Sequence, residues 1–140
     1  MKIIYNDLLN FLDKKPQINE LSNSLFQLGH EHELQQEILD MEFTPNRGDC
    51  LSLKGLARDL NFFYGFKDAT QTYEGNIDEL KIEFINKSPE ICPKISFLQI
   101  EIEDTPKRYD QYIEDYFKIL NVGKNNFFTD ISNYLSYETG

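Results

Sequence analysis

Apolar residues recur with helical spacing near the start of the chain. A short β-prone run at 2–5 precedes the first such pattern, and Asn6 stands where a helix N-cap is expected. Asn19 has the same place before a second pattern, which Gly29 is expected to end. That second pattern puts its apolar side chains at i, i+4 and i+7, on Leu21, Leu25 and Leu28. Helices this short are not stable alone, so both are expected to pack on a partner.

The next segment predicts a strand, a tight turn and a helix. Residues 38–43 alternate between apolar and charged side chains, which is typical of a half-buried strand. The turn formers of 44–49 follow, and Asp49 is well placed to cap a helix. Gly65 is expected to end that helix. The helix carries one broad apolar face made by Leu53, Leu56, Ala57, Leu60, Phe63 and Tyr64.

The second half of the chain has a weaker pattern. Residues 66–76 are polar and without period, and we interpret them as a linker. Alternation at 80–85 predicts one strand, and 92–102 leads into another, in which the side chains of 97–102 alternate. An apolar stripe at helical spacing predicts a helix over 104–120, and 127–137 is expected to be a strand that enters a helix. The order of elements predicts an α+β chain made of two units.

Composition sets limits on the partners of such a chain. Its 140 residues, 40% of them hydrophobic, are enough for one ordinary domain or two small ones. The net charge of −10 repels phosphate backbones, so binding of nucleic acid would need a local basic patch. Arg47, Lys54 and Arg58 could form such a docking patch for RNA or a partner subunit, although a solvated helix face explains them as well. With no signal-peptide pattern and no membrane-length apolar run, a soluble cytoplasmic protein is expected.

The residues offer little catalytic chemistry. Cys50 and Cys92 lie far apart without a CxxC pattern, which favours reduced thiols over a disulfide. His30 and His32 would share one face of a strand, but no third soft ligand is close in sequence, so a solvated edge strand is preferred to a metal site. A helix start would lower the pKa of Cys50, yet nothing in the sequence places a base beside it. We therefore expect Cys50 to be a packing residue, with no catalytic group and no metal ligand.

One long run of residues resembles a known family. The segment 41–60 contains Thr44, Pro45, Asn46, Arg47, Asp49 and Cys50 in order, and a helix with Lys-Gly-Leu-Ala-Arg-Asp follows. It closely resembles the β subunit of bacterial phenylalanyl-tRNA synthetase, in which a strand leads to Thr-Pro-Asn-Arg-x-Asp-Cys-Leu-Ser and a helix. The opening of the chain, the pair Cys92-Pro93 and the segment 128–135 are similar to the same subunit in the same order. In this resemblance the 44–50 residues are mainly structural.

The resemblance implies a division of the chain. Residues 1–65 would form a small helical, winged-helix-like domain with short strands, 66–76 a linker, and 77–140 the incomplete start of a mixed α/β editing domain. In the usual bacterial subunit roughly 110 residues of an OB-fold tRNA-binding domain precede the Thr-Pro-Asn-Arg strand. Only 34–37 stand there in this chain. The OB-fold domain is therefore expected to be absent, and the two halves of the first domain to join directly.

The resemblance also implies a role in translation. The partners would be the synthetase α subunit, in an α₂β₂ assembly, and tRNA(Phe), and the whole enzyme would use ATP and Mg²⁺, with no cofactor in this chain. Ser132 and Asn133 match two positions of the family's editing pocket, but the chain ends at Gly140, before the His that completes the pocket, so no hydrolysis is expected. The alternatives are a stand-alone nucleic-acid or protein-binding module and a trans-editing aminoacyl-tRNA hydrolase. If the editing domain is incomplete, the apolar stripe of 127–137 should be an exposed patch.

Overall fold

The computed structural model describes residues 1–66, 75 and 81–140. Its contacts divide the chain into two compact units, Met1–Ala69 with Pro106–Gly140 and, separately, Thr70–Thr105. This grouping differs from the expected division at residue 77, because the C-terminal helices share a core with the N-terminal segment. The larger unit therefore combines the beginning and the end of the chain.

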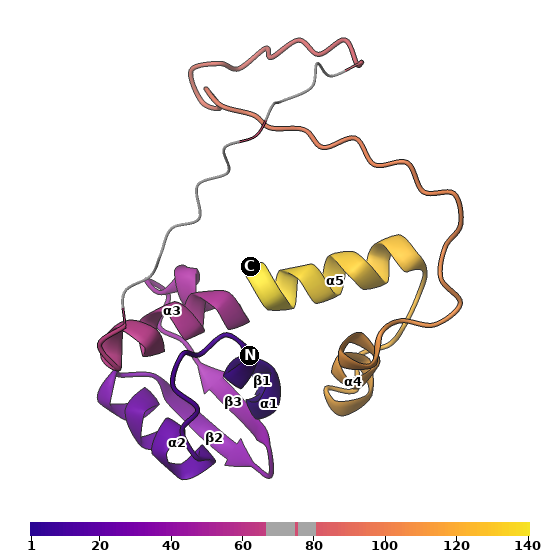
Figure 1. Ribbon diagram of the computed structural model, residues 1–140. Helices are drawn as coiled ribbons and strands as arrows, with labels where there is room; N and C mark the ends of the chain where they lie inside the picture. The colour runs from indigo at the N-terminus through magenta and orange to yellow at the C-terminus, as the bar shows by residue number, and fades with distance from the viewer. Residues whose placement is uncertain (67–74, 76–80) are drawn as a thin grey trace. The chain divides into compact units, whose positions relative to one another are not determined.

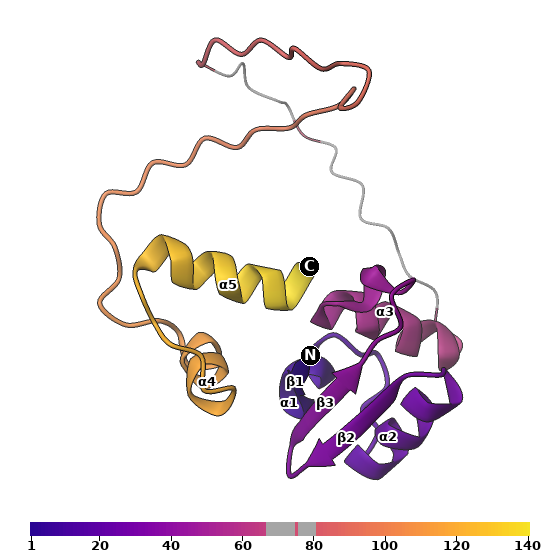
Figure 2. The ribbon, with the colours of Figure 1, turned by 180° about the vertical axis from the view of Figure 1, so that it is seen from behind.

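The larger unit contains a three-stranded antiparallel sheet with the strand order β1-β3-β2 (Figures 1 and 2). Its strands are β1 (Lys2–Ile4), β2 (Glu31–Gln35) and β3 (Ile38–Glu42). Leu39 and Met41 of the central strand are buried, which confirms the half-buried strand expected at 38–43. The edge strand β2 is mostly exposed, as the solvated-edge interpretation predicted for 31–33, but that interpretation was wrong for His30, which is buried just before the strand.

Three helices complete the N-terminal part of this unit. They are α1 (Tyr5–Asn10), α2 (Ile18–Gln27) and α3 (Leu53–Phe63), and a 3-10 turn, η1 (Gly48–Cys50), precedes α3. Gly29 and Gly65 have φ of 82° and 83°, a conformation open to glycine, and both follow helices as expected. The apolar face of α3 is confirmed at its centre, where Leu53, Leu56, Ala57 and Leu60 are buried.

The expected N-caps were wrong. Asn6 and Asn19 lie inside α1 and α2, whose N-cap positions are Ile4 and Gln17. Asp49 does not cap α3, because the chain first makes the η1 turn and the carboxylate of Asp49 is bound by arginine side chains. Ser52 caps α3 instead, with its hydroxyl oxygen accepting from the Gly55 N–H at 3.1 Å.

Two C-terminal helices, α4 (Gln111–Ile119) and α5 (Phe127–Thr139), pack into the same core. The helix expected from residue 104 therefore begins later, and the strand expected at 127 is wrong, because Asn126 caps a helix that starts there. The expected exposed patch is only partly present. Tyr134 and Tyr137 are buried, whereas Phe128 and Leu135 are exposed. No helix among the described residues combines the length and apolar character that crossing a membrane requires.

The smaller unit has no helix or strand among its described residues, 75 and 81–105. The strands expected at 80–85 and 97–102 are therefore wrong for every residue that is described there. Ile85 is 76% exposed and Ile100 is 68% exposed, so the alternating side chains gain little from burial, and an isolated pair of strands is marginal. The expected linker at 66–76 lies outside the described residues, except for 66 and 75.

Candidate functional site

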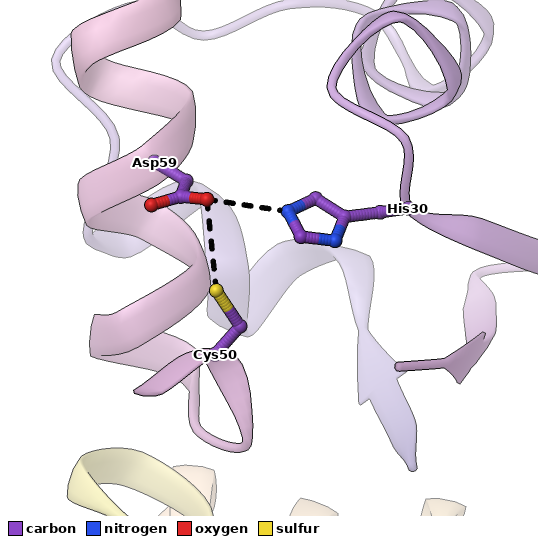
Figure 3. Close-up of side chains that lie close together, drawn as sticks. All are labelled: His30, Cys50 and Asp59. Carbon is purple, nitrogen blue, oxygen red and sulfur yellow. Dashed lines mark hydrogen bonds and ion pairs between the residues drawn. The ribbon is translucent and has the colours of Figure 1, made fainter. Parts of the chain in front are cut away.

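The side chains of three separate segments meet in one buried cluster (Figure 3). His30 follows Gly29 at the end of α2, Cys50 closes η1, and Asp59 lies on α3. The positive φ of Gly29 reverses the chain, and the His30 N–H then donates to the Leu25 carbonyl oxygen at 2.9 Å. These local turns bring an imidazole, a thiol and a carboxylate together; we refer to His30, Cys50 and Asp59 as the Asp59 cluster.

The carboxylate of Asp59 is the centre of this cluster. Its Oδ2 lies 3.3 Å from His30 Nε2 and 3.6 Å from Cys50 Sγ, and it also accepts from the Arg47 guanidinium. Burial raises the pKa of Asp59, but hydrogen bonds from Arg47 and His30 outweigh that effect and leave the pKa below its usual value. Asp59 is therefore ionised at neutral pH, and Arg47 supplies the compensating charge.

Arg47 links the cluster to the turn that precedes α3. Its Nε and Nη2 donate to the two oxygens of Asp49 at 3.0 and 3.2 Å, and the same Nη2 lies 2.8 Å from Cys50 Sγ. Arg58 also binds Asp49. Hydrogen bonding to Arg47, with Arg58 as a further cation, lowers the pKa of Asp49 to about 2. One exposed carboxylate thus holds two arginines in place.

The candidate docking patch of Arg47, Lys54 and Arg58 is neutralised within the protein. Arg47 pairs with Asp49 and Asp59, Arg58 pairs with Asp49, and Lys54 Nζ lies 2.7 Å from a carboxylate oxygen of Glu138. Three cations meet three carboxylates, so this set carries no surplus positive charge. A polyanion would have to compete with bonds that already exist.

The thiol of Cys50 is unsuited to nucleophilic attack. The side chain is fully buried, and burial together with the charge of Asp59 raises the pKa of Cys50 to about 12. A helix start was expected to lower this pKa, but burial and the nearby carboxylate have the larger effect. The sequence places no base beside this thiol, but the structure does, because the potential ligand atoms of His30, Cys50 and Asp59 all lie within 4.8 Å of one another.

The other sequence-predicted residues lie outside the cluster. Thr44, Pro45 and Asn46 form the exposed turn before η1, where the Arg47 N–H donates to the Thr44 carbonyl oxygen. Ser132 is exposed on α5. Asn133 is half-buried and lines a surface hollow of about 490 Å³. That hollow is also lined by Leu51, Tyr116 and Tyr137.

Sequence reasoning missed Asp59 and the contribution of His30. Asp59 lies three residues after Leu56 and directly before Leu60, so it borders the apolar face of its helix. This position could have identified it as a half-buried carboxylate. His30 could be placed only by knowing how β2 lies relative to α3.

A second half-buried carboxyl, Asp7 on α1, contacts the end of α5. The Tyr137 hydroxyl donates toward Asp7 Oδ2 at 3.4 Å and accepts from the Ile4 N–H at 3.0 Å. Burial raises the pKa of Asp7 to about 6, with Asp115 adding to the rise and the Tyr137 hydrogen bond opposing it. The folded state holds this proton more tightly than the unfolded chain does, so stability falls as pH rises between about 4 and 6.

The fold and the cluster together define a small α+β protein whose charged motif is bound internally. No family model matches the chain, and no solved structure matches it. The chain is similar to curated proteins, each described as a phenylalanine–tRNA ligase beta subunit. It is 26% identical over 152 residues to the one from Rhodopirellula baltica, with 100% of this chain and 22% of that protein covered.

Two further relatives carry the same description. The Psychrobacter arcticus protein is 27% identical over 111 residues, which cover 76% of this chain and 14% of that protein. The Blochmanniella floridana protein is 32% identical over 107 residues, which cover 74% of this chain and 13% of that protein. The chain therefore spans less than a quarter of the length of each of these three relatives.

Proposed function

We propose that this chain corresponds to a part of a phenylalanine–tRNA ligase β subunit and serves as a scaffold in the aminoacylation of tRNA(Phe). The observation that carries the proposal is similarity over the whole chain to the R. baltica subunit, with two further subunits matching about three quarters of it. The resemblance at 41–60 is centred on the segment that builds the Asp59 cluster. The match therefore includes residues with a definable physical task.

That task is to fix the start of α3 against the rest of the unit. Arg47 bridges Asp49 and Asp59, the 3-10 turn presents Cys50 to the same carboxylate, and Ser52 caps the helix. Removing one partner of a half-buried, hydrogen-bonded ion pair is costly, because it leaves the other charge unpaired. This supports a structural role for the motif rather than a chemical step.

The hairpin between β2 and β3 supports the proposed domain organisation. The strands are joined by a two-residue turn, Gln36 and Glu37, so the segments before and after it pair directly. The R. baltica alignment, 152 residues over the 140-residue chain, leaves no room inside it for an inserted domain of roughly 110 residues. In the proposal, α1, α2 and this hairpin form a winged-helix-like domain that lacks the OB-fold insertion.

The partners and cofactors belong to the whole enzyme in this proposal. The α subunit would assemble with the protein in an α₂β₂ enzyme, which uses ATP and Mg²⁺ to charge tRNA(Phe). Ser132 and Asn133 would contribute to an editing surface, and the hollow that Asn133 lines is consistent with that place. The neutralised docking patch supports assembly with protein partners over direct binding of nucleic acid by this part of the chain.

Co-expression tests the proposal. The protein that carries these residues is produced with the α subunit of the same genome, and the purified material is assayed for charging of tRNA(Phe) with phenylalanine. Co-purification and charging are expected. A protein that leaves the α subunit unbound, and instead binds RNA or hydrolyses Tyr-tRNA(Phe) by itself, would contradict the proposal in favour of a binding module or an editing hydrolase.

A further inference from the structure

The Asp59 cluster contains the ligand types of a transition-metal site. We propose that His30, Cys50 and Asp59 bind a divalent metal ion of the zinc class, in competition with the Arg47 guanidinium. The three residues supply one imidazole nitrogen, one sulfur and one carboxylate oxygen, and these are the usual protein ligands of Zn²⁺. His30 and Cys50 are buried, and the Asp59 side chain is only 16% exposed.

Two of the three distances between the ligand atoms match the edges of a tetrahedral centre, and the third pair, His30 Nε2 and Cys50 Sγ, lies within 4.8 Å. Zinc bonds of about 2.1 Å to nitrogen and oxygen and about 2.3 Å to sulfur give tetrahedral edges of about 3.4 Å for N···O and about 3.6 Å for S···O. The observed His30 Nε2···Asp59 Oδ2 distance is 3.3 Å, and the Cys50 Sγ···Asp59 Oδ2 distance is 3.6 Å (Figure 3). An ion could therefore be bound between these atoms once His30 Nε2 and Cys50 Sγ lie at the corresponding N···S edge of about 3.6 Å.

The electrostatics of the cluster already favour a cation. Arg47 Nη2 contacts both Cys50 Sγ and Asp59 Oδ2, so a guanidinium now supplies the positive charge that these atoms attract. The Arg47 side chain is 30% exposed and has Asp49 as a second partner. It can therefore leave the cluster while it remains bound to Asp49. Its departure would open a fourth coordination position toward water.

The exchange balances in charge and protons. The Cys50 S–H bond breaks as the S–metal bond forms, and the thiol proton passes to water. The Nε2–H proton that His30 donates to Asp59 moves through water to Nδ1, so that neutral imidazole binds through Nε2, and Asp59 binds as the carboxylate. No oxidant or reductant takes part. The inference does not depend on the synthetase proposal, because it concerns only residues within this fold.

Cobalt titration tests the site in the Cys92→Ser protein, which lacks the exposed second thiol. Co²⁺ reports thiolate ligation by its charge-transfer absorption, and Zn²⁺ should displace it. We expect one Co²⁺ per chain with this absorption, and its loss after Cys50→Ser or Asp59→Asn. Arg47→Gln should tighten binding by about tenfold or more, because it removes the competing cation. Lys54→Gln, which removes the same charge from the same region, should leave the affinity unchanged.

The Arg47→Gln protein decides the matter if other variants fail to fold. Folding of this variant is checked first by circular dichroism. If it is folded and shows no thiolate–cobalt absorption, the inference is overturned. It is also overturned if the absorption appears only when Cys92 is present, or if Arg47→Gln binds Co²⁺ no more tightly than the parent protein does.

Discussion

Substitution of Gly55 by alanine tests how closely α3 packs against the η1 turn. The behaviour of isolated helices predicts that this substitution stabilises the protein, whereas the geometry of this protein predicts that it destabilises it. Replacing a glycine inside a helix with alanine usually stabilises a protein by about 0.5–1 kcal/mol. At Gly55, however, an added Cβ would lie 1.9 Å from the backbone oxygen of Asp49 and 3.0 Å from the Ser52 hydroxyl oxygen. The helix therefore approaches the η1 turn more closely than any side chain allows.

The magnitude follows from what would have to move. The Asp49 carbonyl is backbone, so it cannot rotate aside as a flexible side chain would. Relief of such overlap by shifting backbone costs typically about 1–3 kcal/mol. The shift would also weaken the Ser52 cap, which is worth about 1 kcal/mol. We expect Gly55→Ala to lower the free energy of unfolding by about 3 kcal/mol, a large part of a typical domain's stability.

Urea denaturation followed by circular dichroism measures this effect. Gly48→Ala is the matched control, because no atom lies within 4 Å of its added Cβ and its φ is not positive. That control should change the free energy of unfolding by no more than about 0.5 kcal/mol. A Gly55→Ala protein as stable as the parent, or more stable, would show that the close approach of α3 to η1 is wrong.

Three further substitutions test other parts of the fold by the same denaturation assay. Asp7→Asn should raise the free energy of unfolding by about 1 kcal/mol near pH 7, after allowance for the partial exposure of this side chain. Near pH 3.5 the same substitution should have little effect. A stabilisation that does not depend on pH would contradict the raised pKa of this carboxyl. Gln36→Gly should stabilise the protein by about 0.5 kcal/mol, because Gln36 has a φ of 57° in the β2–β3 turn and glycine adopts positive φ without strain. A loss of stability would contradict this backbone conformation of Gln36. Tyr137→Phe should lower the free energy of unfolding by about 1–3 kcal/mol, because it leaves the buried Ile4 N–H without this acceptor. Tyr112→Phe, at an exposed site, should be nearly neutral. Equal effects of the two substitutions would refute the Tyr137 contact.

The elements that sequence predicted well are those set by local periodicity. The 38–43 strand and the apolar face of α3 depend on neighbours within a few residues, and both are present. The glycine stops at Gly29 and Gly65 depend on one backbone angle. These features are visible in a single sequence because the same short segment carries both the signal and the structure.

Some of the predictions that failed depend on the local choice of a helix cap, and others depend on contacts between distant segments. The segment 127–137 was expected to be a strand that enters a helix, but the Asn126 cap starts the helix at Phe127, and Tyr134 and Tyr137 are buried on it. Asn6 was expected to cap α1, yet β1 runs into that helix directly. The Asp59 cluster combines residues from a helix end, a turn and a helix face, and no local spacing relates them.

The segment 41–60 contains several residues that depend on one another. Arg47 binds Asp49 and Asp59, Arg58 binds Asp49, and Gly55 makes room for the Asp49 carbonyl. These five residues therefore restrict one another's residue types. Elsewhere the core is built from apolar side chains that can replace one another at similar volume, and such packing imposes no comparable restriction. His30 is the exception, because it reaches the Asp59 cluster from outside the segment, and it supplies the nitrogen that makes the Asp59 cluster a candidate metal site.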